Sequence, residues 1–182
     1  MTPGDLTDLG TPGRKHISYA AGWKLKEDAW SPGENESVFL GVDFDRELQS
    51  FPAWLVAKIL VGTGDVPEFV TAPDADSTGT AELCVGLRKY GSLGRTEPFA
   101  SAGVAWLTGG ITGYKEETAD AFSIGEESTL GVWADVGIQV PVTRSFTLGF
   151  IAHHSVGSEV QIEGSGLELG GTSLLFTLGV RR

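Results

Sequence analysis

The sequence has few basic residues, a single cysteine and no long apolar run. Its 182 residues include 13 Lys and Arg against 24 Asp and Glu, which gives a formal net charge of -11. Nucleic-acid binding needs a clustered basic face, so this acidic balance argues against a nucleic-acid partner. The lone Cys84 cannot form an intramolecular disulfide, and it leaves the redox compartment open.

Long apolar segments and helical periodicity are also missing. The longest apolar stretch, residues 51–62, is about half of the roughly 20 residues that a membrane helix requires, and Lys58 interrupts it. Any contact with a bilayer would therefore be made by strands. Residues 1–14 are polar and rich in Gly and Pro, which predicts a flexible tail and shows no signal-peptide pattern.

What the sequence does contain is strict alternation, clearest in residues 128–141. The even positions are aliphatic: Leu130, Val132, Ala134, Val136, Ile138 and Val140. A period of two predicts a strand with one apolar face. The opposite face is mostly Gly, Thr and Trp, with the single charge of Asp135. Small, sparsely charged residues suit the crowded lumen of a narrow barrel, so we expect the aliphatic side chains to face outward, toward lipid.

Seven further segments have strand patterns. They cover residues 15–26, 37–45, 51–62, 78–90, 98–107, 145–154 and a final strand with Leu174, Phe176, Leu178 and Val180 in phase. The links alternate between long and short, the long ones covering residues 27–36, 63–77, 109–127 and 155–166. With an even number of strands, both termini lie at the end of the barrel that has the short links, which we call the short-turn rim; the other end is the long-loop rim. The sequence therefore predicts an all-β domain over residues 15–182, a single eight-stranded antiparallel up-and-down transmembrane β-barrel.

The sixth and seventh strands also predict a register. Outward positions are even-numbered in both strands, as in Val136 and Leu148. Cross-strand partners share a face, so paired residue numbers must sum to an even value and the turn must have an odd number of residues. We expect a three-residue turn over 141–143 or a five-residue turn over 141–145, unless a bulge near Pro141 restores the count.

Four segments carry a resemblance to a known family: GVDFDRELQSFPAWLVAKIL, ELCVGLRKYGSLGRTEPFASAGVAWL, GVWADVGIQVPVTRSFTLGF and LELGGTSLLFTLGV. Each resembles the hairpins of the OmpA/OmpW-like eight-stranded outer-membrane barrels of Gram-negative bacteria, particularly the poorly characterised branch, over roughly residues 17–181. The resemblance implies a monomer in the bacterial outer membrane with a structural or surface-interaction role. Outer-membrane lipids and lipopolysaccharide would be its partners.

Charge differs between the two predicted rims. The short-turn rim has Arg46, Arg95, Arg144, Arg181 and Arg182. The long-loop rim has Lys115 and sixteen carboxylates: Glu27, Asp28, Glu34, Glu36, Asp65, Glu68, Asp74, Asp76, Glu116, Glu117, Asp120, Glu126, Glu127, Glu159, Glu163 and Glu168. Such a rim would repel polyanions and attract divalent cations, which could bridge the loops to lipopolysaccharide phosphates. The simpler interpretation is that these charges only keep the loops soluble.

Lys58, Glu82, Arg88 and Asp135 occupy inward positions of their strands. An unpaired charge in a lumen is costly, whereas a hydrogen-bonded network would plug the barrel. We therefore expect these four side chains to close the lumen; a gated path for small solutes is the alternative. No His, Cys and Asp cluster has metal-ligand spacing, so the sequence predicts neither a metal nor a cofactor.

His153 and Ser155 are the one pair of catalytic appearance, and Glu163 or Glu168 could orient the histidine. The pair resembles the His-x-Ser motif of outer-membrane lipid A deacylases, with Val156 in place of the Asn that commonly follows. Strand phase turns both side chains into the lumen, away from lipid. The sequence therefore predicts a protein that is not an enzyme; a deacylase and a soluble ligand carrier of lipocalin type are the competing classes.

Overall fold

The computed structural model of the chain describes residues 14–25, 37–48, 51–65, 75–115, 120–162 and 165–182. These residues form eight strands, and no helix that could cross a bilayer occurs among them. The strands are β1 (Lys15–Leu25), β2 (Ser37–Glu47), β3 (Trp54–Asp65), β4 (Ala75–Tyr90), β5 (Glu97–Lys115), β6 (Asp120–Pro141), β7 (Phe146–Ile162) and β8 (Ser165–Arg181).

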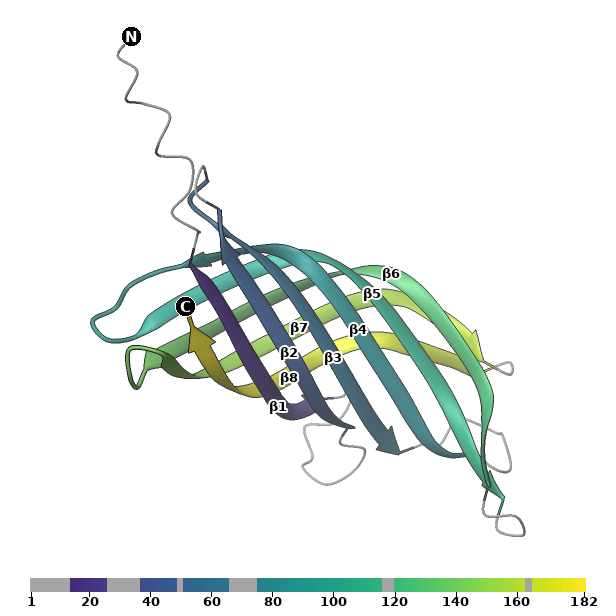
Figure 1. Cartoon of the computed structure of the whole chain (residues 1–182). Coiled ribbons are helices and arrows are strands. Elements are labelled where there is room, and N and C mark those ends of the chain that lie inside the picture. The colour runs from purple at the N-terminus through teal and green to yellow at the C-terminus, as the bar shows by residue number, and fades with distance from the viewer. Residues whose placement is uncertain (1–13, 26–36, 49–50, 66–74, 116–119, 163–164) are drawn as a thin grey trace, which may run out of the picture.

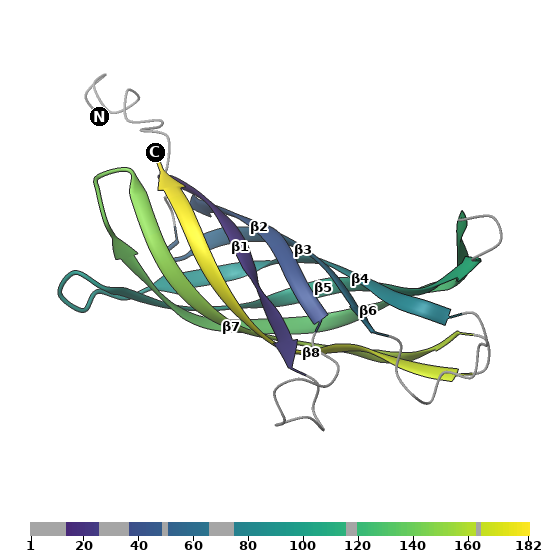
Figure 2. The same cartoon turned by 90° about the horizontal axis from the view of Figure 1, so that it is seen from below.

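The strands form one closed antiparallel barrel. Each strand pairs with the next, and β8 pairs back with β1, so the sheet closes on itself (Figures 1 and 2). Lys15 and Arg182 exchange backbone hydrogen bonds of 2.9 and 3.0 Å, which brings the first and last strands together at one rim. Closure satisfies the backbone groups that an open sheet would leave at its edges. The predicted eight-stranded up-and-down barrel is confirmed.

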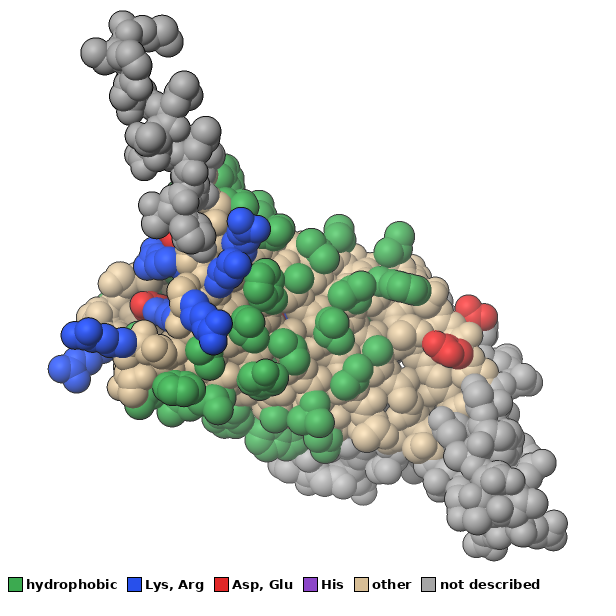
Figure 3. All heavy atoms as spheres, in the orientation of Figure 1, with side chains coloured by type: hydrophobic (Ala, Val, Ile, Leu, Met, Phe, Trp, Pro, Cys, Tyr) green, Lys and Arg blue, Asp and Glu red, His purple; other side chains and the backbone are tan. Residues whose placement is uncertain are grey.

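The predicted assignment of faces is also correct. Val136 is 61% exposed, whereas Asp135 beside it is 2% exposed. The same alternation around the barrel leaves these apolar side chains exposed: Ile17, Tyr19, Leu40, Val42, Ile59, Val61, Leu83, Val85, Val104, Trp106, Leu148, Phe176 and Leu178. Figure 3 shows apolar side chains over the barrel wall, with Lys and Arg gathered at the end where the chain terminates. An apolar exterior of this extent suits contact with lipid.

Two apolar groups fill much of the lumen. One comprises Ala20, Phe39, Leu60, Phe99, Ile151 and Leu175, and the other Val56, Cys84, Ala105, Leu107, Ile111, Trp133 and Leu169. Inward glycines make room for the larger rings. A Cβ atom at Gly62 would lie 2.5 Å from the ring of Phe39, and one at Gly137 would lie 2.5 Å from that of Phe99. The many glycines of the inner face therefore allow a narrow barrel to contain aromatic side chains.

The register of β6 and β7 has the predicted parity, but the turn lies further along the chain than predicted. Pro141 pairs with Thr147, an even sum, and the N–H of Val142 donates to the Phe146 carbonyl at 2.9 Å. The turn therefore has three residues, 143–145, and both predicted positions are wrong. The Thr143 hydroxyl accepts hydrogen bonds from the N–H groups of Ser145 and Phe146 at 3.3 and 3.0 Å, which closes the turn at this point.

Two predicted long loops are largely strand. Residues 109–115 and 120–127 extend the β5–β6 ladder, where Gly109 pairs with Glu127 and Gly110 with Glu126. Residues 155–162 likewise extend β7 and pair with β8, apart from an irregularity between Val156 and Glu159. Glycine and acidic residues indicated loops in the sequence, but ladder hydrogen bonds join backbone groups and do not depend on the side chains.

The ends of β3 and β4 also differ from the prediction. β3 begins at Trp54 rather than at Phe51, because Pro52 lacks the N–H that a ladder position would donate. β3 reaches Asp65 and β4 starts at Ala75, so the predicted loop 63–77 is shortened at both ends. The flexible tail predicted for 1–14 and the loop predicted for 27–36 lie outside the described residues, apart from Arg14.

The short β4–β5 link is a tight hairpin. Leu93 and Thr96 exchange backbone hydrogen bonds of 2.8 and 3.0 Å, leaving a two-residue turn at Gly94 and Arg95. Gly94 has a φ of +64°, as the first central residue of a primed turn requires. The turn confirms that the predicted link 91–96 is short.

Candidate functional site

A charged network lies inside the barrel. It arises from strand alternation, since each outward aliphatic residue turns its neighbours into the lumen. The described part of the lumen has four buried carboxylates, on Asp43, Asp45, Glu82 and Asp135, and two fully buried cations, Lys58 and Arg88. All six are at most 2% exposed. The four side chains singled out from the sequence therefore meet in one place, where Asp43 and Asp45 join them.

Asp135 on β6 is the centre of this network. Its Oδ2 atom accepts from Lys58 Nζ at 2.6 Å and from Arg88 Nη2 at 3.1 Å. Its Oδ1 atom lies 2.7 Å from Nδ1 of His153. One carboxylate thus links β3, β4 and β7 across the lumen, and every bond it makes is removed from water.

Arg88 organises the carboxylates on β2. Its guanidinium donates to Asp45 at 2.8 Å and to Asp43 at 3.0 Å, and its Nε donates to Ser101 at 2.9 Å. Tyr90 donates its hydroxyl to Asp45 at 2.6 Å. The planar fork of arginine suits this geometry, because its donors can reach several acceptors at once.

His153 on β7 bridges two carboxylates. Its Nε2 lies 2.9 Å from Oε2 of Glu82, and its Nδ1 faces Asp135. A neutral imidazole has only one N–H, so both contacts are hydrogen bonds only when the ring is doubly protonated. With Lys24 Nζ at 3.5 Å from Glu82, the four carboxylates are then matched by four cations: Lys24, Lys58, Arg88 and His153. Balance of this kind is what a low-dielectric lumen requires.

The arrangement does not favour a Ser–His pair. His153 and Ser155 share the inner face of β7, as predicted, but both ring nitrogens of His153 face carboxylates. Ser155 Oγ is buried and forms no hydrogen bond with His153. The side chains of Glu163 and Glu168 lie outside the described ones. His153 is therefore not placed to take a proton from Ser155.

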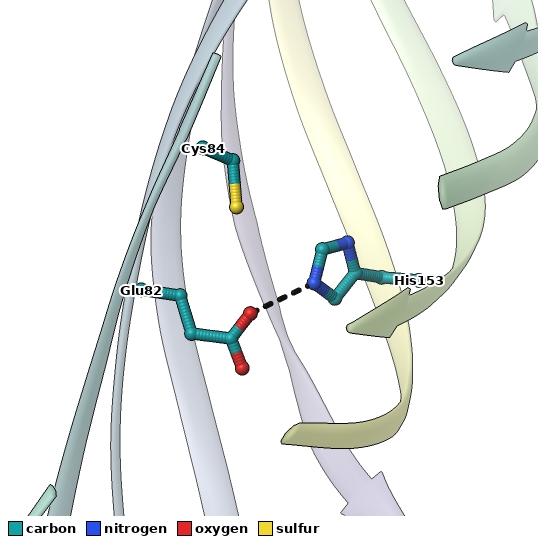
Figure 4. Close-up of side chains that lie close together, drawn as sticks. All are labelled: Glu82, Cys84 and His153. Carbon is teal, nitrogen blue, oxygen red and sulfur yellow. Dashed lines mark hydrogen bonds and ion pairs between the residues drawn. The ribbon is translucent and has the colours of Figure 1, made fainter. Parts of the chain in front are cut away.

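Among the residues that the structure describes, one group of metal-ligand residues meets in the lumen, although no sequence spacing indicated it. Figure 4 shows Cys84 and Glu82 projecting from β4 toward His153. One ligand atom of each residue lies within 4.8 Å of the other two. The sequence could not show this group, because β4 and β7 are not neighbouring strands and meet only across the lumen.

Several members of the network were not predicted from the sequence. Asp43, Asp45 and His16 all occupy inward positions, so strand phase could have found them. His16 contacts Asp45 at 3.4 Å and Thr147 at 3.0 Å. Which residues pair across the lumen depends on the relative height of strands that are not hydrogen-bonded to each other, and no local pattern encodes that height.

The short-turn rim contains a basic cavity of about 720 Å³. It is lined by Arg14, Lys15, His16, Trp54, Tyr90, Gly91, Ser92, Glu97, Arg144, Arg181 and Arg182. Arg181 forms an ion pair with Glu97, and Arg14 pairs with Glu47 at 3.0 Å. The hydrogen bond from Arg14 to Glu47 raises the pKa of Arg14 above its usual value.

Comparison with known proteins gives matches in fold. No family model matches the sequence, and no curated protein is similar to it in sequence. Neisserial surface protein A has a TM-score of 0.61 at 9% identity, covering 92% of this chain and 94% of that one. Ail of Yersinia pestis, solved with the heparin analogue sucrose octasulfate, has a TM-score of 0.57 at 10% identity, covering 94% of this chain and 99% of that one. A major outer membrane protein of Thermus thermophilus has a TM-score of 0.62 at 12% identity, covering 93% of this chain and 99% of that one.

These similarities establish the class of the fold. The chain is a closed eight-stranded antiparallel barrel, the architecture of small bacterial outer-membrane proteins. The matches cover nearly the full length of each compared protein, so the likeness includes the whole barrel and not a single hairpin. At 12% identity or below, it is a likeness of fold alone.

Proposed function

We propose that this chain is an integral protein of a bacterial outer membrane, with a structural or surface-interaction role and no enzymatic activity. The observation that carries the proposal is the reversed polarity of the barrel. Aliphatic side chains cover its outside, and charged side chains are paired within. In a soluble ligand carrier the opposite arrangement is expected, with an apolar interior for the ligand and a polar exterior.

Solubility separates the two classes. The membrane protein should require detergent or lipid and should show heat-modifiable migration, since the folded barrel and the unfolded chain differ in compactness. A chain that dissolves without detergent as a stable monomer would contradict the membrane assignment.

We further propose that the charge network closes the lumen to solutes larger than water. Lys58 and Arg88 both donate to Asp135 across the barrel, and His153 links the same carboxylate to Glu82. These cross-links should leave little room for a permeating ion. Planar bilayers containing the protein should therefore show no large, stable single-channel currents. Such currents, reproducible in the wild-type protein, would favour the gated-path alternative.

The surface role rests on the acidic long-loop rim. Ail was solved with a heparin analogue, a polyanion. The sixteen carboxylates of the long-loop rim should instead repel polyanions and bind divalent cations weakly, at distributed sites that could bridge to lipopolysaccharide phosphates. Calorimetry should find weak binding of calcium or magnesium to the rim. Tight binding of sucrose octasulfate would contradict this partner assignment without affecting the membrane assignment.

A further inference from the structure

The Glu82, Cys84 and His153 cluster combines three residue types that bind transition metals. A carboxylate, a thiol and an imidazole offer atoms that all lie within 4.8 Å of one another (Figure 4). Around tetrahedral zinc, bond lengths of about 2.0–2.3 Å place ligand atoms roughly 3.3–3.8 Å apart. Nε2 of His153 and Oε2 of Glu82, now 2.9 Å apart, would move slightly apart, and Sγ of Cys84 would approach them by at most about 1 Å. Small side-chain rotations are enough for both movements.

The surroundings of His153 are those of a metal-binding histidine. Nδ1 of His153 faces Asp135 at 2.7 Å, which directs Nε2 toward Glu82 and the interior of the cluster. A histidine that binds zinc through one ring nitrogen commonly donates the N–H of its other ring nitrogen to a carboxylate, which sets the tautomer and orients the ring. Trp133 stacks on the imidazole with ring centroids 6.0 Å apart and restricts its rotation.

Two buried serines lie beside His153 on the inner face. Ser155 lies two positions from His153 on β7, and Ser173 is directly opposite His153 on β8. The Oγ atom of Ser173 has no hydrogen-bond partner within the described part of the chain. An unpaired buried hydroxyl is costly, and a water in the fourth position of a metal would give Ser173 a partner.

We propose that Glu82, Cys84 and His153 form a binding site for one zinc-class divalent cation inside the barrel. Thiolate and imidazole ligands favour zinc over calcium or magnesium, which prefer oxygen. When the cation binds, Nε2 of His153 and Sγ of Cys84 each release a proton. Two positive charges leave as two enter, so the charge of the buried network does not change. Lys58 and Arg88 stay paired with Asp135, and Lys24 stays beside Glu82.

The same chemistry gives a spectroscopic test on the purified, folded barrel. Cobalt should bind at one equivalent and produce a thiolate-to-cobalt charge-transfer band, which zinc should remove by competition. X-ray absorption of the zinc-loaded wild type should find a single sulfur at about 2.3 Å. This second measurement needs no variant and so does not depend on whether a substituted barrel folds.

Variants then identify the ligands. Cys84→Ser should abolish the charge-transfer band and weaken zinc binding by at least the 10–100-fold that loss of an outer-shell partner typically costs. Glu82→Gln should weaken binding while keeping the band. His154→Ala is the matched control, because this histidine is next along β7 but exposed and bonded to Thr172. It should bind cobalt as the wild type does.

Three results would overturn the metal site. These are cobalt bound without the charge-transfer band, zinc without sulfur in its coordination shell, and unchanged affinity in Cys84→Ser. The first would mean that metal binds only at carboxylates such as those of the acidic rim. None of these outcomes bears on whether the barrel resides in a membrane, which detergent dependence tests separately.

Discussion

Replacing Asp135 by alanine should destabilise the barrel more than any single rim substitution. The change removes the acceptor for Lys58 at 2.6 Å, for Arg88 at 3.1 Å and for His153 at 2.7 Å. Breaking a buried ion pair by removing one partner typically costs about 3–5 kcal/mol, because the remaining charge stays buried. Arg88 still has its carboxylates on β2, whereas Lys58 keeps only Asp43, at 3.8 Å. We therefore expect a loss within that range and not a multiple of it.

The assay is urea unfolding of the folded barrel in detergent or lipid vesicles, followed by tryptophan fluorescence with chelator present. Glu47→Ala is the control, since it breaks the exposed pair with Arg14 and should cost about 0–1 kcal/mol. Adding Lys58→Met to Asp135→Ala should recover part of the loss, because the stranded ammonium is removed. If Asp135→Ala unfolds within about 1 kcal/mol of the wild type, the lumen is wet and the network reasoning is wrong.

Two further substitutions test the barrel wall. Val136→Arg places a charge on the outward face and should cost about 2–4 kcal/mol of unfolding free energy if that position lies near the bilayer midplane. Leu93→Arg, in a rim turn, should cost little. Equal unfolding midpoints of these two variants in vesicles would contradict a lipid-facing Val136. Gly86→Ala should destabilise the barrel, because the added Cβ would overlap the Ala102 carbonyl oxygen, whereas a Cβ at Gly79 has no atom within 4 Å. The unfolding midpoints of Gly86→Ala and Gly79→Ala measure this difference, and a tolerated Gly86→Ala would show that the strands can separate there.

The number of strands and the inward or outward direction of their side chains were predictable, because both depend on a period-two pattern within each strand. In β6, the alternation of Val136 with Asp135 was enough to assign lipid and lumen faces, and the structure agrees. Strand ends were less predictable. The sequence between Gly109 and Glu127 has loop composition, yet much of it pairs as a ladder, because backbone hydrogen bonds form once the hairpin is in register.

The lumen network was predictable only as a set of inward residues. The alternation within each strand placed Lys58, Glu82, Arg88 and Asp135 inside the barrel. It could not predict that Lys58 pairs with Asp135, because β3 and β6 are not neighbouring strands in the sheet. The same limit applies to His153. Ser155, two residues along the strand, was its candidate partner in the sequence, whereas the structure pairs His153 with Asp135 and Glu82.

The aliphatic face of the barrel should meet lipid, and the opposite face should lie in the lumen. Two of the five native tryptophans report on this arrangement directly. Trp106 is 54% exposed on the outer wall, and Trp133 is 2% exposed inside, with its Nε1 donating to the Val104 carbonyl at 2.9 Å. In two variants, each retaining one of these tryptophans and phenylalanine at the other four positions, lipids with brominated acyl chains should quench Trp106 strongly and Trp133 weakly. Equal quenching, or a Trp106 that bromolipids do not quench, would contradict the inside-out barrel.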